Sequence, residues 1–240
     1  MGGGGKVASN AHRTFWESPS LRDADVDPAH RLSLGEGVTP VTRIAAQPQL
    51  LLKRDDHNPT GSHKDRAAAF QVARAAHRGA AGVVISSSGN AGIATSRYAE
   101  LHNLPAWICV HPETDADKLA AIDGDTTTLI VTERAINTAK LLSRELSIPN
   151  LRPSTSDDAL IGYGSLGDEI AGIECEHVVL FATSGATAVA VANISCARHG
   201  ATRQVHFVQG EGNAALVQPD AAITDACLLY TSPSPRDATL

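Results

Sequence analysis

Short apolar segments recur along the middle of the chain, and a longer polar or helix-forming stretch separates each from the next. Most of them are rich in β-branched side chains, which is typical of strands buried inside a parallel sheet. They predict strands at residues 50–54, 81–86, 106–110, 127–131, 177–182 and 204–209. Between them, helix-forming residues and apolar positions at helical spacing predict helices at residues 65–78, 90–102 and 133–146.

Alternating strands and helices are typical of an α/β fold with a mostly parallel sheet, which is the fold class that we expect. The two ends of the chain depart from this pattern. Residues 1–32 are polar and include Pro19 and Pro28, so we expect a poorly ordered or loosely docked lead-in. Residues 227–240, CLLYTSPSPRDATL, resemble translated adaptor sequence, and we expect an irregular, exposed tail that is not native.

The composition narrows the classes of function. Hydrophobic residues make up 42% and charged residues 19% of the 240 residues, which is ordinary globular usage. The formal net charge of -6 argues against a nucleic-acid-binding protein, and no apolar run has the length of a membrane span or the form of a secretory signal. The four cysteines are scattered without a CxxC pair, so we expect free thiols in a reducing cytoplasm and no metal site.

Candidate chemistry gathers in three glycine-containing turns at residues 58–66, 86–92 and 182–188. Each turn follows a predicted strand or opens a helix, and the carboxyl ends of parallel strands share one edge of a sheet. Helix N-termini present backbone N–H groups to anions. The first turn also holds Lys64 at the expected start of a helix. A positioned amine together with N–H groups for a phosphate suits pyridoxal 5'-phosphate, whose aldehyde reacts with lysine.

Five motifs carry a resemblance to a known family. They are SLGEGVTPV (33–41), LLLKRDDHNPTGSHKDRAAA (50–69), ISSSGNAGIATSRYA (85–99), GYGSLGDEI (162–170) and VVLFATSGATAVAV (178–191). With these motifs the chain resembles the fold-type II pyridoxal-phosphate enzymes of the tryptophan synthase beta-like superfamily, and threonine synthase in particular. The resemblance implies a two-lobed, three-layer α/β/α fold with mostly parallel sheets. The small lobe would span residues 58–150, and the large lobe, which binds the cofactor, would combine 33–57 with 151–226.

The resemblance also implies roles for residues in the three turns. Lys64 would bind the cofactor aldehyde as a Schiff base and would move the Cα proton of the substrate. Asn90 would hydrogen-bond the ring hydroxyl oxygen of the cofactor. The substrate carboxylate would be bound by Ser87, Ser88, Gly89 and Ala91. The cofactor phosphate would be bound by Thr183, Ser184, Gly185, Ala186 and Thr187.

Each of these residues also has a structural alternative. Lys64 could be a solvated surface lysine, Asn90 an ordinary helix cap, and residues 182–188 an apolar strand that runs into an Ala-rich helix. Thr183 and Ala186 depart from the family pattern, because glycines are frequent at these two positions. Hydroxyl groups in the loop could compensate as donors, whereas the added side chains could crowd a phosphate.

The polar residues around Lys64 are expected to be structural. Asp65 and Arg66 would form an ion pair or helix contacts, and Asp65 would also suit the dipole of the helix N-terminus. The charged residues at 54–56 would lie in a solvated loop. His63 would pack rather than take part in the reaction.

The resemblance implies a lyase or synthase that acts on an amino acid with pyridoxal phosphate. The nearest activity is that of threonine synthase, which converts O-phosphohomoserine and water to threonine and phosphate. Serine/threonine dehydratase and other β-eliminating or β-replacing enzymes are alternatives. A late family segment, which provides a polar partner for the pyridine nitrogen, is not recognisable after residue 209, so we expect a C-terminally truncated chain. A non-catalytic remnant that binds the cofactor or a partner subunit stays open, as does a homodimer.

Overall fold

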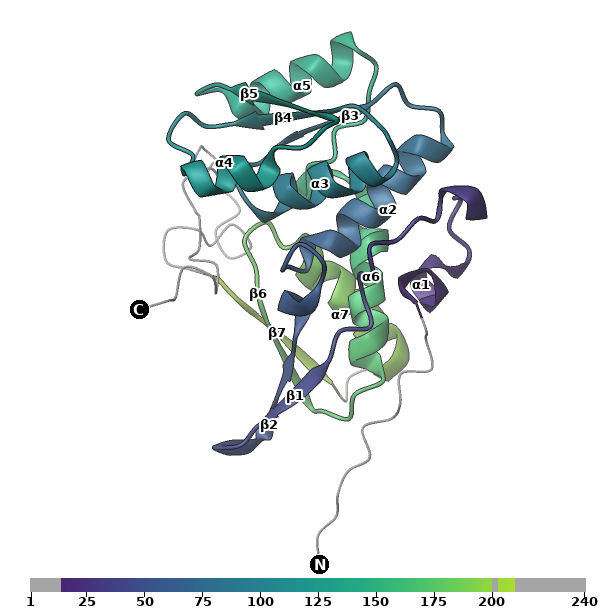
Figure 1. The fold of residues 1–240 in the computed structure, drawn as a ribbon. Helices are drawn as coiled ribbons and strands as arrows, with labels where there is room; N and C mark the ends of the chain where they lie inside the picture. Colours follow the sequence, from purple (N-terminus) through teal and green to yellow (C-terminus); the bar gives the residue numbers. More distant parts are fainter. Residues whose placement is uncertain (1–13, 200–202, 210–240) are drawn as a thin grey trace, which may run out of the picture.

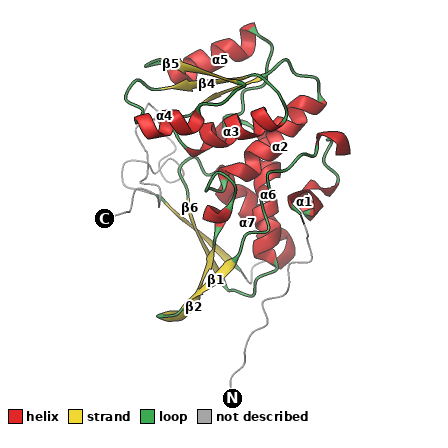
Figure 2. Ribbon diagram, viewed as in Figure 1, coloured by secondary structure: helices red, strands yellow, loops and turns green. Residues whose placement is uncertain are grey.

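The described part of the chain alternates strands and helices, as the hydrophobic pattern predicts (Figures 1 and 2). The structure, a computed structural model, describes residues 14–199 and 203–209. Its strands are β1 (Val41–Ile44), β2 (Gln47–Lys53), β3 (Val83–Ser86), β4 (Ala106–Val110), β5 (Thr127–Val131), β6 (His177–Phe181) and β7 (Gln204–Val208). Its α-helices are α1 (Pro19–Arg22), α2 (Lys64–His77), α3 (Asn90–Leu101), α4 (Ala116–Ile122), α5 (Ala135–Glu145), α6 (Asp157–Ala171) and α7 (Ala186–His199). Short 3-10 helices are η1 (Phe15–Glu17), η2 (Pro28–His30), η3 (Asp55–His57) and η4 (Pro153–Thr155). Within the described ranges, no helix is long and apolar enough to cross a membrane.

A parallel sheet of β3, β4 and β5 lies between two layers of helices (Figure 1). Because side chains alternate across a strand, neighbouring residues of β3 face different helices. Val83 and Ile85 belong to the main apolar cluster, which includes the buried side of α3. Val84 packs instead with Ala135 and Ala139 of α5. These layers confirm the α/β class, and β4 and β5 have the bounds that the sequence predicts.

A second parallel pair, β6 and β7, packs one face against α6 and α7. Val178 and Val205 lie on this face, among apolar side chains of the two helices. The opposite face is open to solvent in the described structure. On it Val179 is 59% exposed and Phe181 is 85% exposed. The two parallel sheets are therefore packed differently, one on both faces and the other on one.

The apolar run at residues 50–54 was predicted to be a buried strand of a parallel sheet, and this prediction is wrong. It belongs mostly to β2, which pairs antiparallel with β1 in a hairpin that projects from the body of the molecule (Figure 1). Leu50 and Leu52 in this hairpin are each 43% exposed. An apolar run favours a strand, but it does not show which partner the strand will have or whether both of its faces will be covered.

Helices α2, α6 and α7 pack side by side and connect the hairpin with the two parallel sheets (Figure 1). At Gly162 of α6, an added Cβ would lie only 2.4 Å from the carbonyl oxygen of Arg66 in α2. Gly162 is the first glycine of a Gly-x-Gly-x-x-Gly spacing at residues 162–167. In dinucleotide-binding proteins, glycines with this spacing follow a strand and lie at the start of a helix. Here the glycines lie inside α6 and allow close helix packing instead. Since α2 contacts both α3 and α6, the lobe boundaries at residues 58 and 150 stay a prediction.

The segment before β1 packs onto the core, which corrects the expectation of a loose lead-in for residues 14–32. The carboxylate of Asp168 in α6 accepts hydrogen bonds from the Ser18 hydroxyl at 2.5 Å and from the Ser20 backbone N–H at 2.7 Å. A polar average composition concealed a few large apolar side chains, whose burial favours docking. These buried side chains are Phe15, Trp16, Leu21 and Val26. Residues 1–13 and the expected tail at 227–240 lie outside the described residues.

Candidate active site

Lys64 is the first residue of α2 and lies against an aromatic side chain of α6. Its Nζ atom is 5.4 Å from the centre of the Tyr163 ring. Tyr163 is fully buried, whereas Lys64 is partly buried. The face of an aromatic ring attracts a cation, so the ring favours one position of the lysine head group. Lys64 therefore has a fixed neighbour that a fully solvated surface lysine lacks.

The turn that precedes Lys64 is held by Asp65. Its carboxylate accepts two hydrogen bonds from Thr60, one from the backbone N–H at 2.8 Å and one from the hydroxyl at 2.5 Å. Between them, Gly61 has a φ of 82°, in the left-handed region that favours glycine. Burial raises the pKa of Asp65 to about 6, although the bonds from Thr60 oppose this shift. Asp65 thus fixes the turn, while its expected ion-pair partner Arg66 binds other carboxylates.

His63 packs beside Lys64 as a neutral imidazole. Its ring centroid is 5.7 Å from that of Tyr163, in agreement with the prediction that it packs. Burial lowers the pKa of His63 to about 3, and the positive charge of Lys64 acts in the same direction. His63 therefore carries no second positive charge beside the lysine at neutral pH.

The second candidate turn leads from β3 into α3. Asn90 is the first residue of the helix and is exposed, while the N-cap position belongs to Gly89. The structural alternative, in which Asn90 caps the helix, is therefore wrong. An added Cβ at Gly89 would meet nothing within 4 Å, whereas one at Gly92 would lie 2.6 Å from the Ser87 carbonyl oxygen. The loop is thus tight on its inner side and open at the helix N-terminus, where an anion could bind.

Two serine hydroxyls hold this loop in place. The Oγ of Ser87 accepts a hydrogen bond from the Gly92 N–H at 3.1 Å, and the Oγ of Ser88 accepts one from the His111 N–H at 3.2 Å. A hydroxyl that accepts from a backbone N–H keeps its own hydrogen, so both serines could still donate to a carboxylate. The side chain of Ala91 packs against the main core, and its backbone N–H lies in the first turn of α3, where N–H groups have no partner inside the helix.

The third candidate turn leads from β6 into α7, which begins at Ala186. Gly185 has a φ of 82°, so the left-handed position of the loop is occupied by a glycine. Thr183 and Ala186 do not have a positive φ, and their side chains therefore cause no backbone strain. The first N–H groups of α7 have no partner inside the helix and suit a phosphate, with the hydroxyls of Ser184 and Thr187 nearby in sequence.

A small apolar cluster connects Lys64 with the start of α7. Tyr163, which lies below Lys64, packs with Ala67 of α2 and Ala190 of α7. Ala186, the first residue of α7, packs against the same cluster. One buried side chain is thus shared by the helix of the lysine and the helix of the candidate phosphate loop.

The structure leaves part of the predicted site untested. Whether Asn90 and residues 183–187 share one pocket with Lys64 stays a prediction. A broad hollow lies elsewhere, at the C-terminal end of α6, and is lined by residues 171–176 together with His199 and Arg203. None of the predicted site residues lines this hollow, so it is not the candidate active site.

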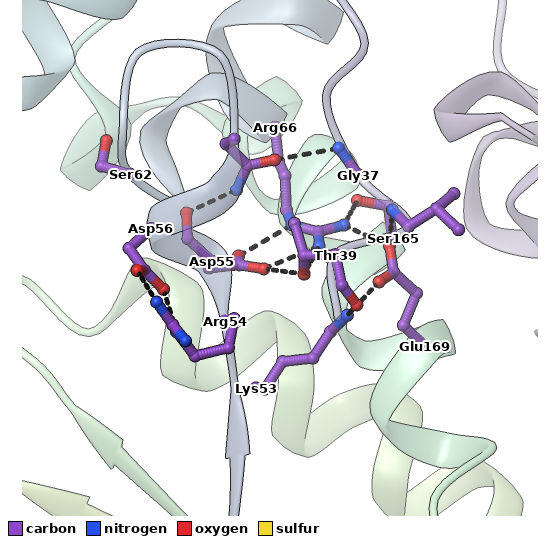
Figure 3. A network of polar contacts seen from close by, with 12 residues as sticks. Gly37, Thr39, Lys53, Arg54, Asp55, Asp56, Ser62, Arg66, Ser165 and Glu169 are labelled. Carbon is purple, nitrogen blue, oxygen red and sulfur yellow. Dashed lines mark hydrogen bonds and ion pairs between the residues drawn. The ribbon is translucent and has the colours of Figure 1, made fainter. Parts of the chain in front are cut away.

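A buried network of charges surrounds the first turn of α2 (Figure 3). The side chain of Arg66 is 0% exposed, and its guanidinium lies 2.8 Å from Asp55 and 2.6 Å from Glu169. Glu169 also pairs with Lys53 at the end of β2. Burial opposes the charges, but Arg66 outweighs it and keeps the pKa values of Asp55 and Glu169 below their usual range. Asp55 and Glu169 therefore stay ionised beside Arg66, while burial lowers the pKa of Lys53 and the charge of Glu169 opposes this shift.

The prediction of a solvated loop at residues 54–56 is right for two residues and wrong for the third. Arg54 and Asp56 form an exposed pair with contacts of 2.9 and 2.6 Å. Asp55 instead points inward, where it accepts from the Thr39 hydroxyl at 2.6 Å and pairs with Arg66. The sequence contained one signal of this inward position. Arg66 lies next to the run of alanines at the start of α2, and a buried positive charge requires a partner of opposite charge.

These residues fit pyridoxal phosphate. The partly buried amine of Lys64 lies against the ring of Tyr163, and the N-terminus of α7, which follows the left-handed Gly185, is a candidate site for the phosphate. A family model described as pyridoxal-phosphate dependent enzyme matches residues 32–228. The chain therefore belongs to this family, and pyridoxal 5'-phosphate is its cofactor. Within the family, the parallel sheets place it with the fold-type II enzymes.

Two curated relatives match parts of the chain. A threonine synthase from Synechocystis sp. is 33% identical over 99 residues, which are 38% of this chain and 25% of the relative. A human protein named serine dehydratase-like is 27% identical over 131 residues, which are 55% of this chain and 40% of the relative. The matches thus span from a quarter to two fifths of the length of these relatives.

Solved structures support the fold. An O-ureido-L-serine synthase superposes with a TM-score of 0.68 at 20% identity, covering 76% of this chain and 63% of the other. A pyridoxal 5'-phosphate-dependent aspartate racemase gives a TM-score of 0.69 at 20% identity, covering 75% and 59%. Serine racemase from maize gives 0.64 at 21% identity, covering 69% and 54%. At these identities the similarity establishes the fold alone.

Proposed function

We propose that the protein is a pyridoxal-phosphate-dependent lyase similar to threonine synthase, which converts O-phosphohomoserine and water to threonine and phosphate. The observation that carries this proposal is the contact of Lys64 with the buried ring of Tyr163 at the start of α2. The 33% identity with a threonine synthase over 99 residues favours this activity within the family.

In this proposal each candidate residue has a separate task. When bound, the cofactor supplies an electron sink for negative charge that develops at the substrate Cα. Lys64 would bind the cofactor through its Nζ atom and would later accept the Cα proton, while Tyr163 would hold that Nζ in place. Asn90 would orient the cofactor ring by hydrogen bonding. The phosphate would be bound by residues 183–187 and the substrate carboxylate by residues 87–91.

Cofactor attachment can be tested before any activity. Purified protein with pyridoxal phosphate should gain a visible absorption band, and borohydride should fix the cofactor on the peptide that contains Lys64. Lys64→Ala should lose the band and remain folded by circular dichroism. The matched control is Lys140→Ala, which removes an exposed lysine of α5 and should leave the band unchanged. Labelling confined to another lysine would show that the assignment is wrong.

A second candidate reaction is the dehydration of serine or threonine. The match to the human serine dehydratase-like protein, at 27% identity over 131 residues, favours it because this match is longer. The two reactions give different products from different substrates. Phosphate and threonine released from O-phosphohomoserine would support the first candidate, whereas a 2-oxo acid formed from serine or threonine would support the second. An absorption band without either product would support a non-catalytic protein that binds the cofactor.

We also propose that the protein works in the cytoplasm, as a homodimer and on a small amino-acid substrate. Cys109 is a buried free thiol whose pKa is raised to about 11 by burial, and an unpaired thiol of this kind suits a reducing compartment. Native mass spectrometry of the full chain would test the dimer, and a mass equal to one chain would contradict it.

A further inference from the structure

We propose that Arg66, held between Asp55 and Glu169, is a positioning residue that places Lys64 for its reaction with the cofactor. These three residues are called the Arg66 clamp below. The inference rests on the proposed function, in which Lys64 binds the cofactor. It adds a role for three charged residues that are not part of the cofactor-binding set.

The position of Arg66 in the chain makes this coupling direct. Arg66 follows Lys64 by two residues, in the same first turn of α2, so a displacement of one backbone segment displaces the other. The first turn of a helix has the fewest internal hydrogen bonds and frays most easily. An anchor on this turn therefore has a larger effect on Lys64 than the same anchor farther along α2.

The side chain of Arg66 is fixed in all directions (Figure 3). Its Nε and Nη2 donate to the two oxygens of Asp55 at 2.9 and 2.8 Å, and its Nη1 donates to Glu169 at 2.6 Å. Nη1 also donates to Ser165 at 3.1 Å, and Nη2 also donates to Thr39 at 3.2 Å. These five hydrogen bonds use all five N–H groups of the guanidinium, so the planar group cannot turn without losing some of them.

The backbone at Arg66 is held by the same helix that carries the ring below Lys64. An added Cβ at Gly162 would lie 2.4 Å from the Arg66 carbonyl oxygen, so α2 and α6 touch at this point. The next residue of α6 is Tyr163, whose ring lies 5.4 Å from Lys64 Nζ. Glu169, about two turns further along α6, binds the guanidinium of Arg66. Contacts of both the backbone and the side chain of Arg66 with α6 thus set the distance between Lys64 and Tyr163.

The chemistry of the clamp favours a role in geometry. Replacing a buried ion pair by apolar residues is often neutral for stability, whereas its hydrogen bonds permit one arrangement of the partners. The two positive charges, of Arg66 and Lys53, balance the two negative charges of Asp55 and Glu169. The clamp together with Lys53 therefore adds no net charge next to Lys64, and the clamp can act on the position of Lys64 alone.

The test removes both ion pairs of Arg66 without leaving an unpaired buried charge. Arg66→Met combined with Asp55→Asn removes the fork and keeps the balanced pair of Lys53 and Glu169. The matched control is Arg74→Met combined with Asp158→Asn, which removes another ion pair between α2 and α6, at 2.9 Å, away from the first turn. Both double variants lose an ion pair between α2 and α6, and the Arg66 variant also loses the pair with Asp55 in η3. A general weakening of the contact between α2 and α6 therefore affects both.

The measurement is the preference of pyridoxal phosphate for Lys64 over the exposed Lys140, read by mass spectrometry of borohydride-fixed peptides. Melting curves of each protein show that it is folded at the temperature of labelling. We expect the wild type and the Arg74 control to share one preference, and the Arg66 double variant to lose about tenfold or more of it, because small misplacements of a reactive group are costly. Arg66→Lys, which keeps the charge without the fork, should fall between them.

Each outcome decides the inference. A folded Arg66 double variant with the preference of the wild type would overturn it. If that variant does not fold, Arg66→Lys decides: an unchanged preference overturns the clamp, and a reduced one supports it. A wild type that does not prefer Lys64 would contradict the proposed function itself, and the clamp with it. A loss in the Arg74 control as large as in the Arg66 variant would show that stability alone sets the labelling.

Discussion

Substituting Gly162 by alanine would test the contact between α2 and α6 on which the position of Lys64 depends. The added Cβ would lie 2.4 Å from the carbonyl oxygen of Arg66 and 2.9 Å from the Cα of Ala67. Favourable contacts between non-bonded carbon atoms occur at about 3.5–4.0 Å. Both neighbours are backbone atoms of a helix, so the clash can be relieved only by moving α2 away from α6.

The magnitude follows from two opposing effects. Alanine in place of glycine inside a helix stabilises it by about 1 kcal/mol. Overpacking of a core costs about 1–3 kcal/mol, and we take the upper end because the neighbours are backbone atoms. The free energy of unfolding of Gly162→Ala should therefore fall by about 2 kcal/mol. For a chain of this size, this corresponds to a melting temperature lower by about 4–8 °C.

The control is Gly164→Ala in the same helix. Its Cβ would lie 2.9 Å from Cβ and Oγ of Ser20, so alanine fits only if α1, a helix of four residues, shifts slightly; this is a smaller displacement than moving α2 away from α6. The gain in helix propensity is the same for both substitutions, so their difference measures the clash. We expect Gly164→Ala to melt within a few degrees of the wild type. Thermal unfolding followed by circular dichroism would measure both, and a Gly162→Ala protein as stable as the Gly164→Ala protein would refute the close contact of α2 with α6.

Substitutions at three further residues test other features of the structure. Folding raises the pKa of Asp65 from 3.8 to about 6, so the stability that this group contributes is present below pH 4 and is lost as the pH rises through 6. Relative to Asp65→Asn, the free energy of unfolding of the wild type should fall by up to about 3 kcal/mol over this range, as measured by urea titrations. A constant difference between the two proteins would contradict the shift. Val38 has a φ of 48°, so Val38→Gly should raise the free energy of unfolding by about 1 kcal/mol or less, whereas Val38→Ala should give no such gain. Arg203 donates hydrogen bonds to the carbonyl groups of residues 170, 173 and 175. Arg203→Met should therefore lower the free energy of unfolding by about 2–3 kcal/mol, and Arg203→Lys should lower it by less. Equal stability of the two variants would show that these hydrogen bonds contribute little.

The elements that the sequence predicted well are those whose signal is local. Strands β4 and β5 have the predicted bounds, because a short β-branched run between turns identifies a buried strand by itself. Helix α2 was predicted one residue late, since Lys64 has no property that distinguishes the first helical residue from the last residue of the turn. The local pattern thus fixes the existence of an element better than its ends.

What the sequence did not predict depends on distant partners. The hairpin of β1 and β2 requires a strand that has almost no apolar pattern of its own. The inward turn of Asp55 requires Arg66, whose guanidinium is itself held by Glu169, 103 positions further along the chain. Tyr163 was visible within the GYGSLGDEI motif, but its place below Lys64 follows only from the path of α6. A pattern along the chain carries no information on such pairings.

The glycines of α6 show why one helix can hold three distant segments in fixed relation. Gly162 is in contact with α2, and Gly164 is next to Ser20 of α1. At Gly167 an added Cβ would lie 2.9 Å from the Cβ of Ile194 in α7. At 3.6 residues per turn, Gly162 lies on one side of the helix, and Gly164 and Gly167, about 60° apart, lie on the other. Each side therefore admits a neighbour closer than a side chain would allow. The helix that begins with Lys64, the helix behind the candidate phosphate loop and the N-terminal segment are all packed against this one element. A displacement of α6 would move all of them together, so their distances from one another are better preserved than the distance of any of them from the exposed hairpin.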